Sequence, residues 1–144
     1  MNCKTVAEIN VGDKATLTRT FTEADVFAFA GVSHDVNPVH VDPHFAKNTI
    51  FKQRVAHGMF TASMISALLA NELPGVGTIY LSQTLKFTAP VFLGDTITCE
   101  VEVMEVDREK GRVVFSATLK NQRGDTVLSG ESKVLAPRHK PSVD

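Results

Sequence analysis

One apolar segment constrains this chain more than any other feature of its sequence. From Met59 to Leu69 the residues are apolar nearly all round and interrupted only by small ones, and His57 and Gly58 stand directly before them. A helix without a polar face is buried on every side. At about 14 residues and 1.5 Å per residue it would be roughly 20 Å long, close to the length of an average strand and too short to span a bilayer. We therefore predict a central helix enclosed by other elements.

The chain after this helix alternates between apolar and polar residues, as strands with one exposed face do. The alternation runs through 79–87, 97–103 and 113–119, and a last strand is expected over 126–135 after the polar turn 121–125. Four strands in series with short connections favour an antiparallel meander. One face of such a sheet must be covered, and the apolar helix is the element able to cover it. The predicted architecture is α+β, a single curved antiparallel β-sheet wrapped around a central α-helix.

The residues before the central helix predict shorter elements. The patterns indicate a strand over 13–20, a helix over 22–30 and a turn or two of helix over 44–48. Thr22 is an N-cap for the first helix and Gly31 a stop signal after it. Asn37 is followed by Pro38, which disfavours a continuous helix, so 32–42 is predicted to be a loop. Asp42 precedes a proline at the first position of the second helix.

Length and composition limit the classes of function. The chain has 144 residues, of which 43% are hydrophobic, enough for one domain, predicted for residues 1–136 with a C-terminal tail over 137–144. The net charge of -1 lacks the basic surplus of nucleic-acid-binding proteins, so we expect no nucleic-acid partner. Cys3 and Cys99 stand far apart, without a zinc or disulfide pattern. The N-terminus lacks the apolar core of a signal peptide, and we expect a cytoplasmic protein with no membrane contact.

The densest cluster of ionisable side chains is the segment S-H-D-V-N-P-V-H-V-D-P-H, with three histidines and two aspartates in twelve residues. One explanation is structural: a polar surface loop whose side chains cap helices and bond the backbone. A second is a metal site, whose candidate ligands would be His34, His40 and His44 with Asp35 or Asp42. Their spacing matches none of the recurring zinc patterns such as HExxH.

A third explanation is catalytic and starts from Asp35 and His40. They are five residues apart and separated by a proline that keeps the segment from being helical throughout. A bent loop can aim both side chains at one point. Hydration and dehydration need two such groups, one to remove a proton from water and one to supply a proton at the adjacent carbon.

Gly58 offers the other half of such a site. The first amides of a helix are unpaired and carry the positive end of its dipole, and a glycine there lets a substrate oxygen approach its N–H. A carbonyl bound at that point is polarised toward an enolate. The structural alternatives are a tight entry into the helix for Gly58 and a satisfied core histidine for His57.

Together these motifs resemble the MaoC-like family of (R)-specific enoyl-CoA hydratases. The resemblance rests on the D-x-N-P-x-H core, formed by Asp35, Asn37, Pro38 and His40, and on the A-H-G that precedes the apolar helix. The resemblance extends over nearly the whole chain through the later segments Leu73-Pro74-Gly75, Pro90-Val91 and Gly94-Asp95. It implies a hot dog fold and a homodimer whose sheets join edge to edge, with active sites near the interface.

The resemblance also implies an activity and a set of roles. In this family the matching aspartate and histidine activate a water that adds to a trans-2-enoyl-CoA, giving (3R)-3-hydroxyacyl-CoA. By the resemblance Asp35 and His40 are the catalytic pair, and the Gly58 amide binds the thioester carbonyl. The implied site-organising residues are Asn37, His57 and Ser66. No metal or other cofactor is expected, and a single hot dog domain suggests short to medium acyl chains.

One residue departs from the family pattern, and the motifs also fit functions other than hydration of a CoA thioester. His34 departs from the small or acidic residue that often precedes the aspartate in this family. The alternatives are a 3-hydroxyacyl-[acyl carrier protein] dehydratase, a hot dog thioesterase, or a non-catalytic acyl-CoA-binding protein, which should lack Asp35 or His40. The product would suit polyhydroxyalkanoate synthesis or fatty-acid oxidation equally. The candidate residues for the acyl pocket are Met59, Phe60, Met64 and Tyr80.

Overall fold

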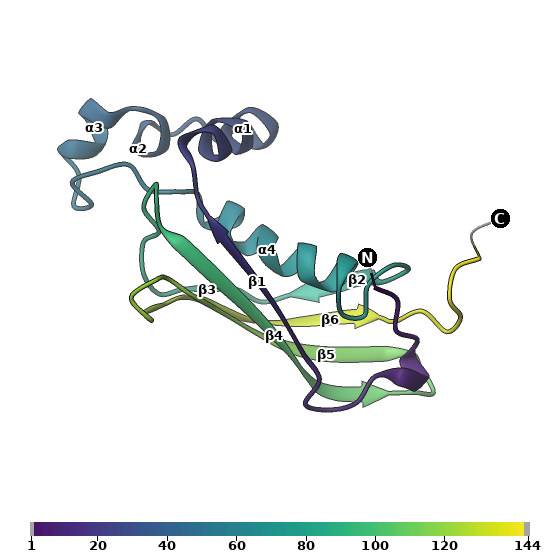
Figure 1. Ribbon diagram of the computed structural model, residues 1–144. Helices are drawn as coiled ribbons and strands as arrows, with labels where there is room; N and C mark the ends of the chain where they lie inside the picture. The colour runs from purple at the N-terminus through teal and green to yellow at the C-terminus, as the bar shows by residue number, and fades with distance from the viewer. Residues whose placement is uncertain (1, 143–144) are drawn as a thin grey trace.

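Helix α4 (Gly58–Asn71) lies along one face of a six-stranded sheet that curves around it (Figure 1). The computed structural model describes residues 2–142. Every strand pair is antiparallel, in the order β1-β4-β5-β6-β2, with β3 also paired to β6. The strands are β1 (Lys14–Thr20), β2 (Ile79–Gln83), β3 (Lys86–Phe87), β4 (Thr96–Asp107), β5 (Arg112–Lys120) and β6 (Thr126–Leu135). The predicted α+β architecture is confirmed.

The alternating strands bury their apolar residues beneath α4. The inward residues of β4 and β5 are almost completely buried: Ile97, Cys99, Val101, Val103, Val113, Phe115, Ala117 and Leu119. From the helix, Ile65, Leu68 and Leu69 pack into the same cluster. Burial of each Val, Ile, Leu or Phe side chain in this layer contributes about 1.5–3 kcal/mol to the stability of the fold.

The helix is not buried on every side, contrary to the prediction from its composition. Met59, Ser63, Ser66 and Ala70 are exposed along one face. The sheet covers a single side of α4, and the residues that face away from it are mostly small. A helix can therefore be apolar nearly all round and still leave one face open within a single chain.

The strand order also differs from a simple meander. Strands β4, β5 and β6 are consecutive neighbours as predicted, but the predicted strand 79–87 lies beyond β6 and is divided into β2 and β3. The chain leaves one edge of the sheet after β1, crosses its face as α4 and returns at the opposite edge. Between β2 and β3 the backbone passes very close to β6, since a Cβ on Gly130 would lie 2.0 Å from the carbonyl oxygen of Thr84.

Three short helices precede α4 and lie beyond one end of it (Figure 1). They are α1 (Glu23–Ser33), α2 (Pro38–Val41) and α3 (Pro43–Lys47). Thr22 caps α1 as predicted, and a hydrogen bond from its backbone N–H lowers the pKa of Asp25. The helix continues past Gly31 to Ser33. The predicted loop 32–42 contains α2, because a proline is favourable at the first position of a helix and Asn37 accepts a hydrogen bond from the Val39 amide (3.2 Å).

The predicted tail begins in contact with the rest of the chain. Strand β6 ends at Leu135, and the Pro137 carbonyl accepts a hydrogen bond from the Val6 amide (2.9 Å). The Arg138 guanidinium donates to the Glu109 carbonyl (2.5 Å). The boundary at residue 136 stays a prediction, and residues 143–144 lie outside the part that the structure describes. Within residues 2–142, no helix combines the length and the apolar character needed to cross a membrane.

Arg108, in the turn after β4, forms hydrogen bonds with the N-terminal segment that contains the short 3-10 helix η1 (Val6–Glu8). Its guanidinium donates to the carbonyls of Val6 (2.5 Å) and Ile9 (2.9 Å), whose side chains are buried. Because hydrogen bonds from a charged donor contribute about 1.5–3 kcal/mol, we expect Arg108→Ala to lower the free energy of unfolding by about 2 kcal/mol in urea titrations. Lys110→Ala, an exposed change in the same turn, is the control and should stay within about 0.5 kcal/mol. Equal losses in both variants would contradict this role for Arg108.

Candidate active site

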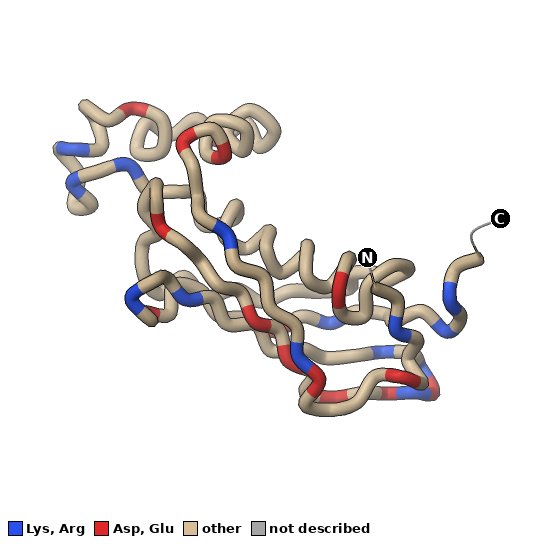
Figure 2. The backbone as a smooth tube through the Cα atoms, viewed as in Figure 1, with Lys and Arg blue, Asp and Glu red and all other residues tan. Residues whose placement is uncertain are grey.

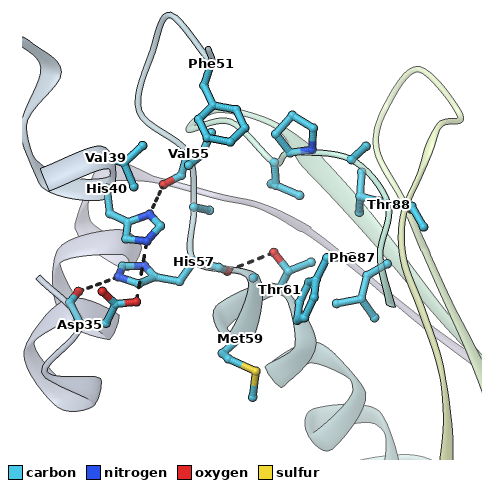
Figure 3. Close-up of a pocket in the computed structure, with 17 residues that line it drawn as sticks. Asp35, Val39, His40, Phe51, Val55, His57, Met59, Thr61, Phe87 and Thr88 are labelled. Carbon is cyan, nitrogen blue, oxygen red and sulfur yellow. Dashed lines mark hydrogen bonds and ion pairs between the residues drawn. The ribbon is translucent and has the colours of Figure 1, made fainter. Parts of the chain in front are cut away.

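A cavity of about 660 Å³ opens between the start of α4, the segment before it and strand β3 (Figure 3). Its ionisable side chains, Asp35, His40 and His57, gather at one end. The rest of the wall is mainly apolar and includes Phe51, Val55, Phe87, Pro90, Val127 and Leu128. The polar cluster and the apolar wall suit a ligand with a reactive polar group and a hydrocarbon part.

Asp35 is presented by the turn between α1 and α2. His34 ends α1 in the left-handed conformation (φ 63°), which turns the chain, and the Asp35 amide donates to the Ser33 hydroxyl (3.1 Å). The Asp35 carboxylate in turn accepts a hydrogen bond from the Asn37 amide (3.2 Å). The side chain is 51% exposed, so water and substrate can both reach it.

His40 projects from α2 toward the Asp35 carboxylate. Its Nδ1 lies 2.7 Å from the carbonyl oxygen of Val55. Since a carbonyl only accepts, Nδ1 must carry the hydrogen, and Nε2 is the nitrogen that exchanges a proton. Nε2 lies 3.7 Å from Asp35 Oδ2, and the His40 side chain is only 12% exposed. The backbone thus fixes which nitrogen of His40 faces the carboxylate.

His57 joins these two residues to α4. Its Nε2 donates to the backbone carbonyl of Asp35 (2.9 Å), and its ring stacks on that of His40 with centroids 3.8 Å apart and an interplanar angle of 26° (Figure 3). His57 is the N-cap of α4. Residues separated by up to 22 positions in the sequence are thereby brought to one point.

Gly58 is the first residue of α4 and lines the cavity. A Cβ at this position would lie 2.6 Å from Cε1 of Phe87, so the ring of Phe87 occupies the space that a side chain would need. The amides of a first helical turn lack partners within the helix and attract negative charge. Glycine at this position therefore leaves room for both an aromatic wall and an approach to the amide.

The other predicted site residues lie outside the cavity within one chain. Ser66 lies on the exposed face of α4, eight residues beyond Gly58, and Asn37 acts as the cap of α2. Of the acyl-pocket candidates, Met59 lines the cavity, whereas Phe60 and Met64 are buried in the core and Tyr80 lies on the edge strand β2.

Two contributors to the cavity were not predicted. The Val55 carbonyl that bonds His40 is a backbone group, so no pattern of side chains predicts it. Phe87 alternates with polar neighbours in the sequence like any inward residue of a strand. Its position beside Gly58 depends on the division of the strand into β2 and β3.

The structure does not bring together the ligands of the alternative metal site, His34, His40 and His44. His34 and His44 are exposed, whereas Asp35, His40 and His57 each place one possible ligand atom within 4.8 Å of the others. The two rings of that trio are stacked, so their in-plane lone pairs lie side by side instead of converging on one ion. Burial raises the pKa of the Cys99 thiol to about 12, so this cysteine is unsuited to act as a nucleophile.

Charges of both signs are distributed over the molecule (Figure 2). Lys14 of β1, for example, pairs with Glu100 of β4 (3.1 Å). The segment between α3 and α4 carries Lys52 and Arg54, and Arg54 pairs with Glu23 of α1 (2.6 Å). Lys52 directly follows Phe51, which lines the cavity.

Comparison with known proteins identifies the family. Residues 5–124 match the family model described as MaoC like domain. The chain is 46% identical over 130 residues to an (R)-specific enoyl-CoA hydratase of Rhodospirillum rubrum, covering 90% of each chain. It is 44% identical over 129 residues to the enzyme of the same name from Aeromonas caviae, covering 90% of this chain and 96% of that one. A solved R-hydratase of Pseudomonas aeruginosa, in unliganded form, matches with a TM-score of 0.91 and 48% identity over 97% of this chain and 90% of that one. The cavity, the fold and these relatives agree, and the chain belongs to the MaoC-like family of hot dog proteins.

Proposed function

We propose that the protein is an (R)-specific enoyl-CoA hydratase, a hydro-lyase that reversibly hydrates short- to medium-chain trans-2-enoyl-CoA to (3R)-3-hydroxyacyl-CoA. One observation carries the proposal: Asp35 Oδ2 and His40 Nε2 lie 3.7 Å apart at the polar end of an apolar cavity that also contains the first turn of α4. The similarity to two (R)-specific enoyl-CoA hydratases over 90% of the chain supports it.

The N-terminus of α4 can bind the thioester carbonyl of the substrate. An oxygen placed at the Gly58 amide would receive a hydrogen bond from a helix N-terminus, where negative charge is favoured. As hydroxyl adds at C3, charge develops on this oxygen, and the amide stabilises the enolate-like transition state more than the ground state. A donor of this kind is worth about 2.7–4 kcal/mol where one has been removed from an oxyanion hole.

Asp35 and His40 would each transfer one of the two protons of the reaction. Their 3.7 Å separation is long for a direct hydrogen bond, and one water can bond to both groups. The Nδ1–H of His40 donates to the Val55 carbonyl. At the start of hydration Asp35 is a carboxylate and His40 Nε2 carries a proton. The Asp35 carboxylate takes a proton from water as its oxygen adds to C3, and His40 Nε2–H delivers a proton to C2. Dehydration runs through the same steps in reverse.

Hydration of crotonyl-CoA is the direct test of this activity. Addition of water removes the conjugated thioester absorbance, and an (R)-specific 3-hydroxyacyl-CoA dehydrogenase reports the configuration of the product. We expect loss of absorbance with (R) product for the CoA thioester, and slower turnover of the same acyl group on acyl carrier protein. Lys52 beside the cavity-lining Phe51 offers a cation for the phosphates of CoA. Inactivity toward CoA thioesters of every chain length would contradict the proposal.

We further propose that the active form is a homodimer. Strand β2 lies at one edge of the sheet, and its Ile79, Tyr80 and Leu81 are exposed apolar residues. The open face of α4 adds Met59. An exposed apolar edge strand is a template for pairing with another chain. A second copy joined at β2 would cover both surfaces.

Sedimentation velocity tests the dimer. We expect the wild-type protein to sediment as a dimer and Leu81→Glu to sediment as a monomer, because the buried edge would then contain unpaired charge. Val11→Glu, which places the same charge on an exposed apolar residue away from the edge strand, should remain a dimer. A compact monomer with full activity would rule out the proposed assembly.

We also propose that the reaction needs neither metal nor other cofactor and takes place in the cytoplasm. The stacked rings of His40 and His57 argue against a shared ion, and both Cys3 and Cys99 are free thiols, as expected in a reducing compartment. Overnight dialysis against EDTA should leave the rate of crotonyl-CoA hydration unchanged, and the purified protein should contain less than about 0.1 equivalent of zinc per chain. Loss of activity that added zinc restores would contradict this.

A further inference from the structure

We infer that His57 is a positioning residue that holds both groups of the catalytic pair in register with the carbonyl-binding end of α4. The inference rests on the proposed hydratase function and gives a specific mechanism to the site-organising role that the resemblance implies for His57, a residue that exchanges no proton. His57 is 2% exposed and contacts Asp35 through a hydrogen bond, His40 through its ring face and Gly58 through the chain itself. One side chain therefore connects the three parts of the site.

The contact with Asp35 anchors the catalytic turn. Asp35 lies between two helices with a half-exposed side chain, so its position depends on its backbone. The Nε2–H of His57 donates to the Asp35 carbonyl (2.9 Å) across 22 positions of sequence. Because His57 is the N-cap of α4, this bond sets the distance between the Asp35 carboxylate and the Gly58 amide.

The contact with His40 restrains its ring in a second direction. Val55 holds the Nδ1 atom of His40 in the ring plane, at 2.7 Å. His57 covers one ring face, with the centroids 3.8 Å apart. Together the two contacts restrict rotation of the imidazole and keep Nε2 directed at Asp35. Misplacement of a reacting group by about 1 Å can cost 10²-fold in rate.

The other nitrogen of His57 argues for positioning and against proton transfer. Nδ1 is buried and has no hydrogen-bond partner within residues 2–142, and the edge-on ring of Phe29 lies on another side of the imidazole with centroids 4.9 Å apart. An Nδ1 lone pair without a partner destabilises the folded protein less than a buried N–H without an acceptor would. With Nε2 donating to the Asp35 carbonyl, the neutral Nε2–H form leaves only the Nδ1 lone pair without a partner within residues 2–142. The ring then has no route by which to exchange a proton with substrate.

Three substitutions of His57 test its contacts with Asp35 and His40 separately. His57→Gln retains an N–H donor for the Asp35 carbonyl but loses the stacked ring, and His57→Phe retains the ring but loses the donor. His57→Leu loses both. We expect kcat for crotonyl-CoA hydration to fall about 10²-fold in His57→Leu and about 10-fold in each of the other two, with KM within about threefold of wild type. Ile65→Val, a buried change farther along α4, is the control for general loosening of the helix and should keep wild-type kcat.

Coupling to Asp35 distinguishes positioning from a general structural role. In an Asp35→Asn background, His57→Leu should lower kcat by less than about threefold, because the group that it positions no longer takes the proton. A full further 10²-fold loss, or wild-type kcat in His57→Leu, would overturn the inference. So would a fall in kcat that only tracks the loss of thermal stability across all four variants.

A second readout does not depend on turnover. With ¹⁵N-labelled histidine, the Nδ1–H of His40 should give a sharp, slowly exchanging NMR signal in the wild-type protein and a broadened one in His57→Leu. An unchanged signal would overturn the inference. If the wild-type protein hydrates no enoyl thioester, the proposed function fails, and this signal still reports whether His57 restrains His40.

Discussion

Asp35→Asn is expected to lower kcat for enoyl-CoA hydration by at least about 10²-fold, the contribution of a well-placed acid or base. An amide has the shape of the carboxylate, and its oxygen can still accept the hydrogen bond that the Asn37 amide donates to Asp35 Oδ1 (3.2 Å). What the variant loses is the ability to take a proton from water. Loss of crotonyl-CoA absorbance, followed at saturating substrate, measures kcat directly.

The control for this substitution is Asp42→Asn. Asp42 caps α3 by accepting hydrogen bonds from the amides of His44 (2.8 Å) and Phe45 (3.2 Å), and asparagine caps helices about as well as aspartate. Both variants remove one negative charge from the same region, but only Asp35 faces the cavity. Equal activity in the two variants, with unchanged circular dichroism, would remove Asp35 from the mechanism.

His40→Asn should have an effect of similar size, with kcat falling at least about 10²-fold. The asparagine side-chain NH₂ reaches the place of Nδ1 and can still donate to the Val55 carbonyl. The variant lacks Nε2, the atom that faces Asp35 and is proposed to deliver the proton to C2. Because the two groups act as a unit, the double variant with Asp35→Asn should be little slower than either single one.

His44→Asn provides the matched control for His40. His44 is an exposed histidine on α3, four residues farther along the same segment. We expect its kcat and KM to stay within about twofold of wild type. Near-normal turnover in His40→Asn would show instead that Asp35 works without the imidazole.

Much of the fold could be predicted because its signals are local. Alternation within β4, β5 and β6 reflects one buried and one exposed face of the sheet, and the structure confirms all three strands. Thr22 and Asp42 marked helix starts because capping involves residues only two or three positions away. The helix α2 was missed because the proline that breaks one helix also starts the next.

The candidate site was predictable in part. Asp35 and His40 were singled out by their spacing and the family resemblance, and the structure brings them to 3.7 Å. Ser66 shared the same resemblance, yet it lies on the open face of α4, outside the cavity that Asp35 and His40 line. The residues around Ser66 are apolar or small on all sides of the helix, so the sequence pattern does not show which face of α4 points away from the sheet.

Local sequence patterns account for most of the strands and helices, since these depend on neighbours a few positions away, and with the family resemblance they single out Asp35 and His40 as candidates for proton transfer. The hydrogen bond from His40 to the Val55 carbonyl, and the contacts of His57 with Asp35 and His40, depend on long-range packing that no local pattern encodes. These contacts join positions 15 to 22 residues apart. They form because α4 crosses the sheet from the β1 edge to the β2 edge, which sets its first turn against the short helices that precede it.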